Sequence, residues 1–391
     1  MTASDGSEID IPFELTDEEK VIIQFPVTSF ILGRSGTGKT TVLTMKLIQK
    51  EQQSLIASQG LHLDGDDLSG LDEKDIVPLK DAGEGFVKQV FITVSPKLCS
   101  AIKNHISGLK RFGSGDVSDQ PSILHMHDII DDQEEFTDIP DNFSNLPHEH
   151  YPLTITYRKF LMMLDGTCRT SFLDVFYGEL QSSIDRGHSN SRALQTFIES
   201  KEVTYEKFAA TYWPRFNADL TKNLDASTVF TEIVSHIKGR YQASSPYISK
   251  LGRQDYVILS DKRFSSLNSE KRDRIYNIFV DYESMKSTAR EFDLSDFVNS
   301  LHTSLVSEGY NGDLLDFVYI DEVQDLTMTQ IALLKYVCRN FKEGFLFAGD
   351  TAQTIARGID FRENKSNSLI CFNLLKISAH IVASFTWHKV S

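Results

Sequence analysis

A glycine-rich segment near the N-terminus has the residue types that bind phosphate. Its residues in order are Gly33, Arg34, Ser35, Gly36, Thr37, Gly38, Lys39, Thr40 and Thr41. The spacing fits the pattern G-x-x-x-x-G-K-[ST], in which backbone N–H groups of a loop face phosphate oxygens. Lys39 would add positive charge for the β- and γ-phosphates, and the Thr40 hydroxyl would ligate Mg²⁺. The alternative is a plain turn before a helix, which the match of the whole pattern disfavours.

Two adjacent carboxylates follow a short apolar run late in the chain. Asp321 and Glu322 begin the sequence DEVQD, directly after the run FVYI at 317–320. Ligands of open α/β folds bind at the carboxyl ends of strands. We expect Asp321 to hold Mg²⁺ and Glu322 to orient and deprotonate an attacking water. An acidic surface turn is the alternative, which the preceding strand and the upstream phosphate loop disfavour.

A glutamine follows a third apolar run. The sequence GDTAQTI at 349–355 places Gln353 a few residues after the run FLFA at 345–348. A neutral amide beside the terminal phosphate would bond a phosphate oxygen or the attacking water and so distinguish a triphosphate from a diphosphate. In isolation such a glutamine is as often a solvent-facing turn residue. The presence of the phosphate loop and of the acidic motif in the same chain favours a role in sensing the γ-phosphate.

The elements that must position these residues follow from the apolar pattern. We predict strands at 27–32, 87–95, 317–320 and 345–348, and helices at 40–49, 97–111 and 328–341. Residues 165–290 are mostly helical in pattern. Strand-helix alternation at both ends with a helical middle predicts a parallel α/β sheet that carries an inserted helical subdomain.

Charge is distributed unevenly along the chain. The formal net charge is −15, but residues 51–90 hold nine acids against three bases and residues 113–155 hold ten acids against none. Residues 156–290 hold twenty bases against sixteen acids, so the acidic total does not exclude nucleic acid. Four scattered cysteines argue against a disulfide framework, and the N-terminus lacks a secretory signal. We therefore expect an intracellular protein, nuclear or cytoplasmic.

These motifs, in this order, resemble the N-terminal core of superfamily 1 UvrD/Rep-like helicases, over about residues 12–362. Ser95 and Lys97 are similar to that family's motif Ia, and Thr156 and Tyr157 to its motif Ib, which line the nucleic-acid path in relatives. Glu19 stands in the place of the adenine-reading Q motif. The resemblance implies a RecA-like P-loop NTPase that uses ATP and Mg²⁺, with single-stranded DNA or RNA as the partner of a full-length protein. The amino-acid sequences of the loop and of residues 349–362 are similar to those of large eukaryotic tetratricopeptide and ankyrin-type (lupus brain antigen-like) proteins.

The sequence departs from the family pattern at two places. Glu19 replaces a glutamine, and a carboxylate accepts from the adenine amino group but cannot donate to a ring nitrogen. Residues 356–359 are Ala-Arg-Gly-Ile, where the family has base-stacking aromatics, each worth about 1–3 kcal/mol per base. The first departure bears on base selectivity, with ATP as the expected nucleotide, and the second weakens unwinding more than it weakens nucleotide binding.

The resemblance implies a division of the chain. We expect 1–164 to be the first part of domain 1A, with acidic insertions at about 51–86 and 113–150. Residues 165–290 would form the helical subdomain 1B, 291–362 the second part of domain 1A, and 363–391 a divergent tail. The tail is apolar, but Lys376 in its middle disfavours a membrane anchor. We expect a fragment that lacks the second motor lobe, with no sign of a homo-oligomer.

Three smaller features have competing interpretations. The aromatics at 205–216 have the spacing of core packing more than of a strand-binding face, and the run Lys271–Arg274 is typical of a solvated helix face. A metal site at His125 and His127 is disfavoured. For the whole chain, a helicase-type NTPase competes with a regulatory module that binds ATP without unwinding; Glu322 favours the enzyme, because a binding module needs no general base.

Overall fold

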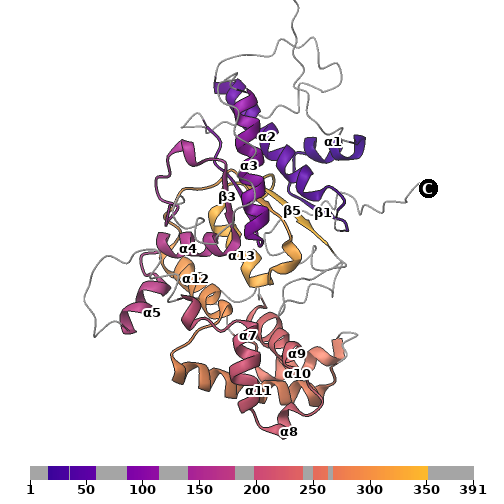
Figure 1. The fold of residues 1–391 in the computed structure, drawn as a ribbon, viewed down its shortest axis with the longest axis vertical. Helices are drawn as coiled ribbons and strands as arrows, with labels where there is room; N and C mark the ends of the chain where they lie inside the picture. Colours follow the sequence, from indigo (N-terminus) through magenta and orange to yellow (C-terminus); the bar gives the residue numbers. More distant parts are fainter. Residues whose placement is uncertain are drawn as a thin grey trace, which may run out of the picture.

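A five-stranded parallel sheet forms the centre of the larger unit (Figure 1). The structure is a computed structural model that describes residues 16–34, 36–58, 86–113, 140–180, 198–240, 250–262 and 267–350. Its strands are β1 (Ser29–Leu32), β2 (Gln89–Thr93), β3 (Leu153–Thr156), β4 (Phe317–Ile320) and β5 (Phe345–Gly349). They lie in the order β1-β5-β4-β2-β3, and all four pairings are parallel. The predicted α/β class with a parallel sheet is confirmed.

Alternation along the strands divides the sheet into two apolar faces. In β4, Val318 and Ile320 belong to one core, and Tyr319 belongs to the core on the opposite face. One face is covered by α1 (Asp17–Gln24), α2 (Lys39–Ser58) and α3 (Pro96–Gly113). The other is covered by α4 (Tyr157–Thr167), α5 (Phe172–Leu180), α12 (Leu294–Glu308) and α13 (Met328–Val337). Successive side chains of a strand point to opposite faces, so β1, β2, β4 and β5 contribute to both cores, whereas the edge strand β3 contributes apolar residues to one of them.

A third core lies in a helical subdomain at one end of the molecule (Figure 1). Its elements are α7 (Tyr205–Lys207), a π-helical turn (Phe208–Tyr212), a short 3₁₀ turn (Trp213–Arg215), α8 (Ala218–Thr221), α9 (Ala226–Thr231), a second π-helical turn (Glu232–Lys238), α10 (Arg253–Lys262) and α11 (Ser269–Ala289). Phe208, Tyr212 and Phe216 are buried in this core, with Tyr205 and Trp213 packed against it. The core-packing interpretation of these aromatics is confirmed.

Several predicted boundaries differ from the structure. Helix α2 continues to Ser58, so it occupies the first eight residues of the insertion expected at 51–86. Phe143 and Leu146, within the insertion expected at 113–150, are buried in the sheet's core. The boundary expected at residue 165 falls inside α4, and α5 packs in the core that includes α12. The polar composition of these segments led to the prediction of loops. A few apolar residues are nevertheless enough to pack a segment against the core, as Phe143 and Leu146 do.

The run Lys271–Arg274 was predicted as a solvated face, and this is wrong for one of its residues. Arg272 is buried and its guanidinium donates to Glu232 at 2.7 Å. Arg274 donates to the Lys222 carbonyl at 2.9 Å. These arginines therefore hold the subdomain together. The histidines at 125 and 127 lie outside the described residues, and no helix within the described ranges is long and apolar enough to cross a membrane.

Candidate nucleotide site

The glycine-rich segment forms a loop between β1 and α2 at the carboxyl edge of the sheet. Gly36 and Gly38 have φ of +78° and +77°, a left-handed conformation that glycine adopts without strain. The Gly33 N–H donates to the Gly349 carbonyl of β5 at 3.2 Å, and a Cβ on Gly33 would lie 2.6 Å from the Thr37 hydroxyl. The predicted loop context between strand and helix is confirmed, while Ser35 lies outside the described residues.

The Lys39 ammonium lies across the inside of this loop. Its Nζ donates to the carbonyl oxygens of Gly33 at 3.0 Å and Arg34 at 2.9 Å. The side chain is buried, with 7% of its surface exposed. In the structure these partners are neutral carbonyls rather than a carboxylate, so an anion brought into the loop would find a positive charge with only weak compensation.

The loop and the acidic motif meet although they are far apart in sequence. The Thr40 hydroxyl donates to Asp321 Oδ2 at 2.5 Å, and the Asp321 backbone N–H donates to Ile92 of the neighbouring strand β2 at 2.9 Å. Asp321 is fully buried, and burial raises its pKa above the usual range; the hydrogen bond from Thr40 opposes this shift and the charge of Glu322 adds to it. A buried carboxylate without a cation partner is a poor stabiliser of the fold and a good ligand for a metal ion.

Glu322 sits beside this carboxylate in a left-handed conformation. Its φ is 55° and ψ 42°, which is uncommon for a residue other than glycine, and its own N–H donates to Asp321 Oδ1 at 2.9 Å. The side chain is half-buried. The hydrogen bond from Thr40 places Asp321, after β4, beside the phosphate loop, and Glu322 follows it in the same turn.

Glu19 also reaches the loop. Its Oε2 accepts from the Thr16 N–H at 2.9 Å and thereby closes a capping box at the start of α1. Its Oε1 lies against Gly38, where an added Cβ would come within 2.8 Å. The carboxylate predicted to occupy the base-reading position therefore lies beside the phosphate loop. One of its two oxygens, Oε2, is bonded in the helix cap.

The nucleic-acid candidates divide into two kinds. Ser95 caps α3, since its side-chain oxygen accepts from the Leu98 N–H at 3.3 Å, and Lys97 is exposed beside it. Thr156 and Tyr157 are buried: Thr156 caps α4 and the Tyr157 hydroxyl donates to the Gln330 carbonyl at 2.9 Å. Both side chains are buried and bonded inside the protein, so that their place along a nucleic-acid path stays a prediction.

Three further residues were predicted for this site or missed by the sequence pattern. Gln353 lies outside the described residues, and Thr41 is half-buried on α2. Gln324, which has no assigned role in the sequence pattern, is buried and bonds both Glu322 and the backbone of Asp350. Its place inside the DEVQD motif was the available signal, although an amide two residues after a carboxylate does not by itself indicate a contact.

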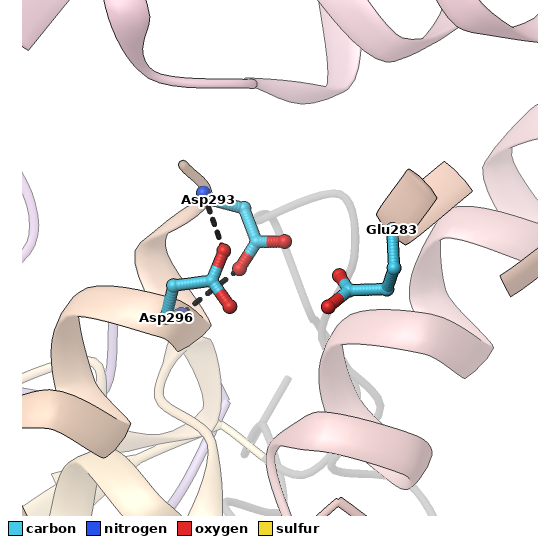
Figure 2. Close-up of side chains that lie close together, drawn as sticks. All are labelled: Glu283, Asp293 and Asp296. Atoms are coloured by element: carbon cyan, nitrogen blue, oxygen red, sulfur yellow. Dashed lines mark hydrogen bonds between the residues drawn. The ribbon is translucent and has the colours of Figure 1, made fainter. Parts of the chain in front are cut away.

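A second group of carboxylates, at the base of the helical subdomain, has the spacing for a metal ion. Figure 2 shows Glu283, Asp293 and Asp296 converging, with ligand atoms within 4.8 Å of one another. Lys238 Nζ lies 2.5 Å from Asp293 and 2.6 Å from Asp296, and Lys286 Nζ lies 2.6 Å from Glu283. Two ammonium groups therefore occupy the position of a cation, and these five residues, the junction cluster, join the subdomain to α12.

The parallel sheet with its glycine-rich loop defines an α/β protein of the P-loop, RecA-like type. The sequence matches the family described as UvrD/REP helicase N-terminal domain over residues 119–366, more than half of the chain. The chain belongs to this family and is a helicase-family nucleotide-binding module. The match includes Asp321 and Glu322, and the phosphate loop precedes it.

The chain is also similar to the human protein TPR and ankyrin repeat-containing protein 1. The two are 23% identical over 454 aligned positions, which cover 92% of this chain and 15% of the human protein. The chain thus spans about 15% of the length of this curated relative. The resemblance to helicase cores and to large tetratricopeptide and ankyrin-type proteins, first seen in the motifs, is confirmed.

Proposed function

We propose that this chain binds ATP with Mg²⁺ at the carboxyl edge of the sheet and hydrolyses the γ-phosphate as the first half of a helicase-type motor. The observation that carries the proposal is the 2.5 Å hydrogen bond between the Thr40 hydroxyl and Asp321 Oδ2. It brings together a phosphate loop and an acidic strand end that are 281 residues apart in sequence. Neither has a structural need for the other's chemistry, whereas a metal-bound triphosphate needs both.

The residues present suit Mg²⁺. Thr40 and Asp321 offer a hydroxyl and a carboxylate oxygen, which are the hard donors that Mg²⁺ prefers. The raised pKa of Asp321, caused first by burial, indicates a carboxylate that gains from a nearby cation. When bound, the ion would neutralise charge on the β- and γ-phosphate oxygens.

The protein groups then have separate tasks. The Lys39 ammonium would exchange the carbonyls of Gly33 and Arg34 for phosphate oxygens, and the N–H groups of residues 34–41 would hold the remaining oxygens. Glu322 would orient the attacking water and accept its proton. Gln353 would report the γ-phosphate, and the free oxygen of Glu19 would accept from the base.

A nucleic-acid track is the further part of this proposal. Ser95 and the exposed Lys97 follow β2 at the same edge of the sheet. Because β2 pairs with β4, single-stranded DNA or RNA bound there would be one β-strand away from Asp321. The second candidate, a regulatory module that binds ATP without unwinding, is favoured by the missing aromatics at 356–359. Stimulation of turnover by a nucleic acid separates the two.

The test is Mg-ATP binding and turnover by the purified chain, with and without single-stranded DNA or RNA. Lys39→Ala should weaken nucleotide affinity by about 10- to 100-fold, because it removes a charge-assisted hydrogen bond. Glu322→Gln should leave affinity unchanged and lower turnover by about 10²- to 10⁴-fold. Lys50→Ala is the matched control on the same helix, since that ammonium lies over the Phe317 ring, 5.2 Å from its centroid, and away from the loop.

Unchanged nucleotide affinity in Lys39→Ala would remove the phosphate-loop assignment. Turnover that no nucleic acid stimulates would leave the nucleotide site standing and favour the regulatory module.

A further inference from the structure

The side chain of Gln324 links two turns of the nucleotide site. Its Nε2 donates to Glu322 Oε2, and its Oε1 accepts from the Asp350 backbone N–H at 2.9 Å. Glu322 follows β4, and Asp350 follows β5, the neighbouring strand. One amide therefore ties the carboxylate that we propose as general base to the segment that leads toward Gln353.

The surroundings hold this amide in one orientation. Gln324 is 1% exposed, and both ends of its amide are bonded. A Cβ on Gly349 would lie 3.0 Å from Gln324 Oε1 and 2.8 Å from a Val323 methyl, so the end of β5 passes close to the amide. If the amide were flipped, its NH₂ group would face the Asp350 N–H and its oxygen the Glu322 carboxylate. Donor would meet donor and acceptor would meet acceptor, which leaves buried polar groups unpaired.

We propose that Gln324 is a positioning residue for hydrolysis, which holds the Glu322 carboxylate by one oxygen and makes its placement depend on the turn after β5. This inference rests on the proposed function. Because Nε2 occupies Glu322 Oε2, the other oxygen is left to accept a proton from water. In that step the water oxygen bonds to the γ-phosphorus, its proton moves to Glu322, and the bond from phosphorus to the β-phosphate bridging oxygen breaks with its electron pair on that oxygen.

One substitution separates the two contacts. Gln324→Glu keeps an oxygen to accept from the Asp350 N–H but replaces the donor to Glu322 with a carboxylate. Gln324→Met removes both hydrogen bonds at similar volume. Gln330→Glu is the matched control: Gln330 is also buried, and its Oε1 accepts from the Thr327 N–H at 2.7 Å, a contact that a glutamate retains.

We expect Gln324→Glu and Gln324→Met to lower kcat by about 10- to 100-fold, because a misplaced base loses orientation that catalysis requires. Mg-ATP affinity should stay within about twofold, as should both quantities in Gln330→Glu. In a Glu322→Gln background, Gln324→Glu should lower kcat by less than about twofold further, because a residue that acts through Glu322 has nothing left to position. A residue with a merely structural role would lower kcat equally in both backgrounds.

Equal kcat losses in the two backgrounds, or a wild-type kcat in Gln324→Glu, would overturn the inference and leave the proposed function intact. If the chain binds Mg-ATP without turning it over, the readout is affinity for ADP with aluminium fluoride, which mimics the transferring phosphoryl group. Wild type and Gln330→Glu should then prefer it to ADP by about tenfold or more, and Gln324→Glu should lose that preference; a retained preference overturns the inference. A chain that binds no nucleotide contradicts the proposed function first, and this inference with it.

Discussion

Two buried aspartates in this molecule have opposite electrostatic surroundings. Asp293, in the junction cluster, contacts the ammonium groups of Lys238 at 2.5 Å and Lys286 at 2.7 Å. Burial would raise its pKa, but the two lysines outweigh burial and hold the pKa well below the usual range. Asp321, at the sheet edge, accepts from the Thr40 hydroxyl and from the Glu322 N–H. Burial raises its pKa, and the hydrogen bond from Thr40 and the charge of Lys39 oppose this shift without reversing it.

The difference separates a structural cluster from a ligand site. At the junction the chain supplies its own cations, so the charges stabilise the folded state and leave no coordination position open. At the sheet edge the Lys39 ammonium donates to carbonyl oxygens, and its charge acts on the pKa of Asp321 more weakly than the Thr40 hydrogen bond does. No ion pair of Asp321 with a lysine or arginine is found among the described residues. Buried carboxylates in the two regions thus differ according to whether lysine ammonium groups contact them.

The largest expected effect on stability is at the junction cluster. Lys238→Met should lower the free energy of unfolding by about 3–5 kcal/mol, because it leaves buried carboxylates undercompensated. Lys250→Met is the control, since Lys250 also contacts Glu283 but its side chain is 44% exposed, and surface pairs contribute at most about 1 kcal/mol. Urea unfolding measures both; similar losses in the two variants would contradict the special place of the junction.

The next effect concerns His302, which lies between the two regions. Its Nε2 contacts the Thr329 carbonyl at 2.8 Å, and the Thr329 N–H donates to Gly239 at the end of the subdomain at 3.2 Å. Burial lowers the pKa of His302 from 6.5 to about 4, so the unfolded chain binds a proton before the folded chain does. Stability should therefore fall as the pH drops through this window, by about 3 kcal/mol in total.

The measurement is the free energy of unfolding at several pH values between 7 and 4, in wild type and His302→Gln. The wild type should lose about 3 kcal/mol more than the variant over this range. If stability falls equally with pH in the wild type and in His302→Gln, the contact between His302 and the Thr329 carbonyl does not depend on a neutral histidine.

The smallest expected effect has the opposite sign. Without nucleotide and metal, Asp321→Asn should raise the free energy of unfolding at pH 7 by roughly 1 kcal/mol, because it removes a buried charge for which the hydrogen bonds and Lys39 compensate only in part. Asp165→Asn is the contrasting control: burial raises the pKa of that carboxyl too, but its oxygens accept from the Ser171 hydroxyl and from the Phe172 and Leu173 N–H groups.

Thermal unfolding with and without Mg-ATP tests the pair. Asp165→Asn should be destabilised and still be stabilised by Mg-ATP, whereas Asp321→Asn should gain stability and lose the response to Mg-ATP. If Asp321→Asn is destabilised and is still stabilised by Mg-ATP, then Asp321 and Asp165 do not differ in the way proposed.

Local patterns were sufficient for four of the five strands and for the phosphate loop, whereas β3 was not predicted as a strand. β4 has the predicted bounds, and β1, β2 and β5 lie within or beside the predicted runs, because buried parallel strands are continuous apolar segments between turn residues. The extent of α2 and the packing of α5 were missed, since polar residues of a helix's exposed face resemble those of a loop. Tyr157 was assigned to a surface by motif position, although its burial depends on α13, more than 150 residues later.

The sequence by itself determined the residue types at the nucleotide site: a glycine-rich turn, a lysine, a threonine and two carboxylates at strand ends. Periodicity also determined the parallel α/β class, because both are properties of short segments. Only the tertiary structure decided which charges are neutralised. Lys238 contacts the carboxylates of the junction cluster although it lies 45 residues before Glu283 in the sequence. Gln324 joins the turns that follow two neighbouring strands. Such pairings depend on distances in space, and electrostatic energies follow those distances and the burial around them rather than separation along the chain.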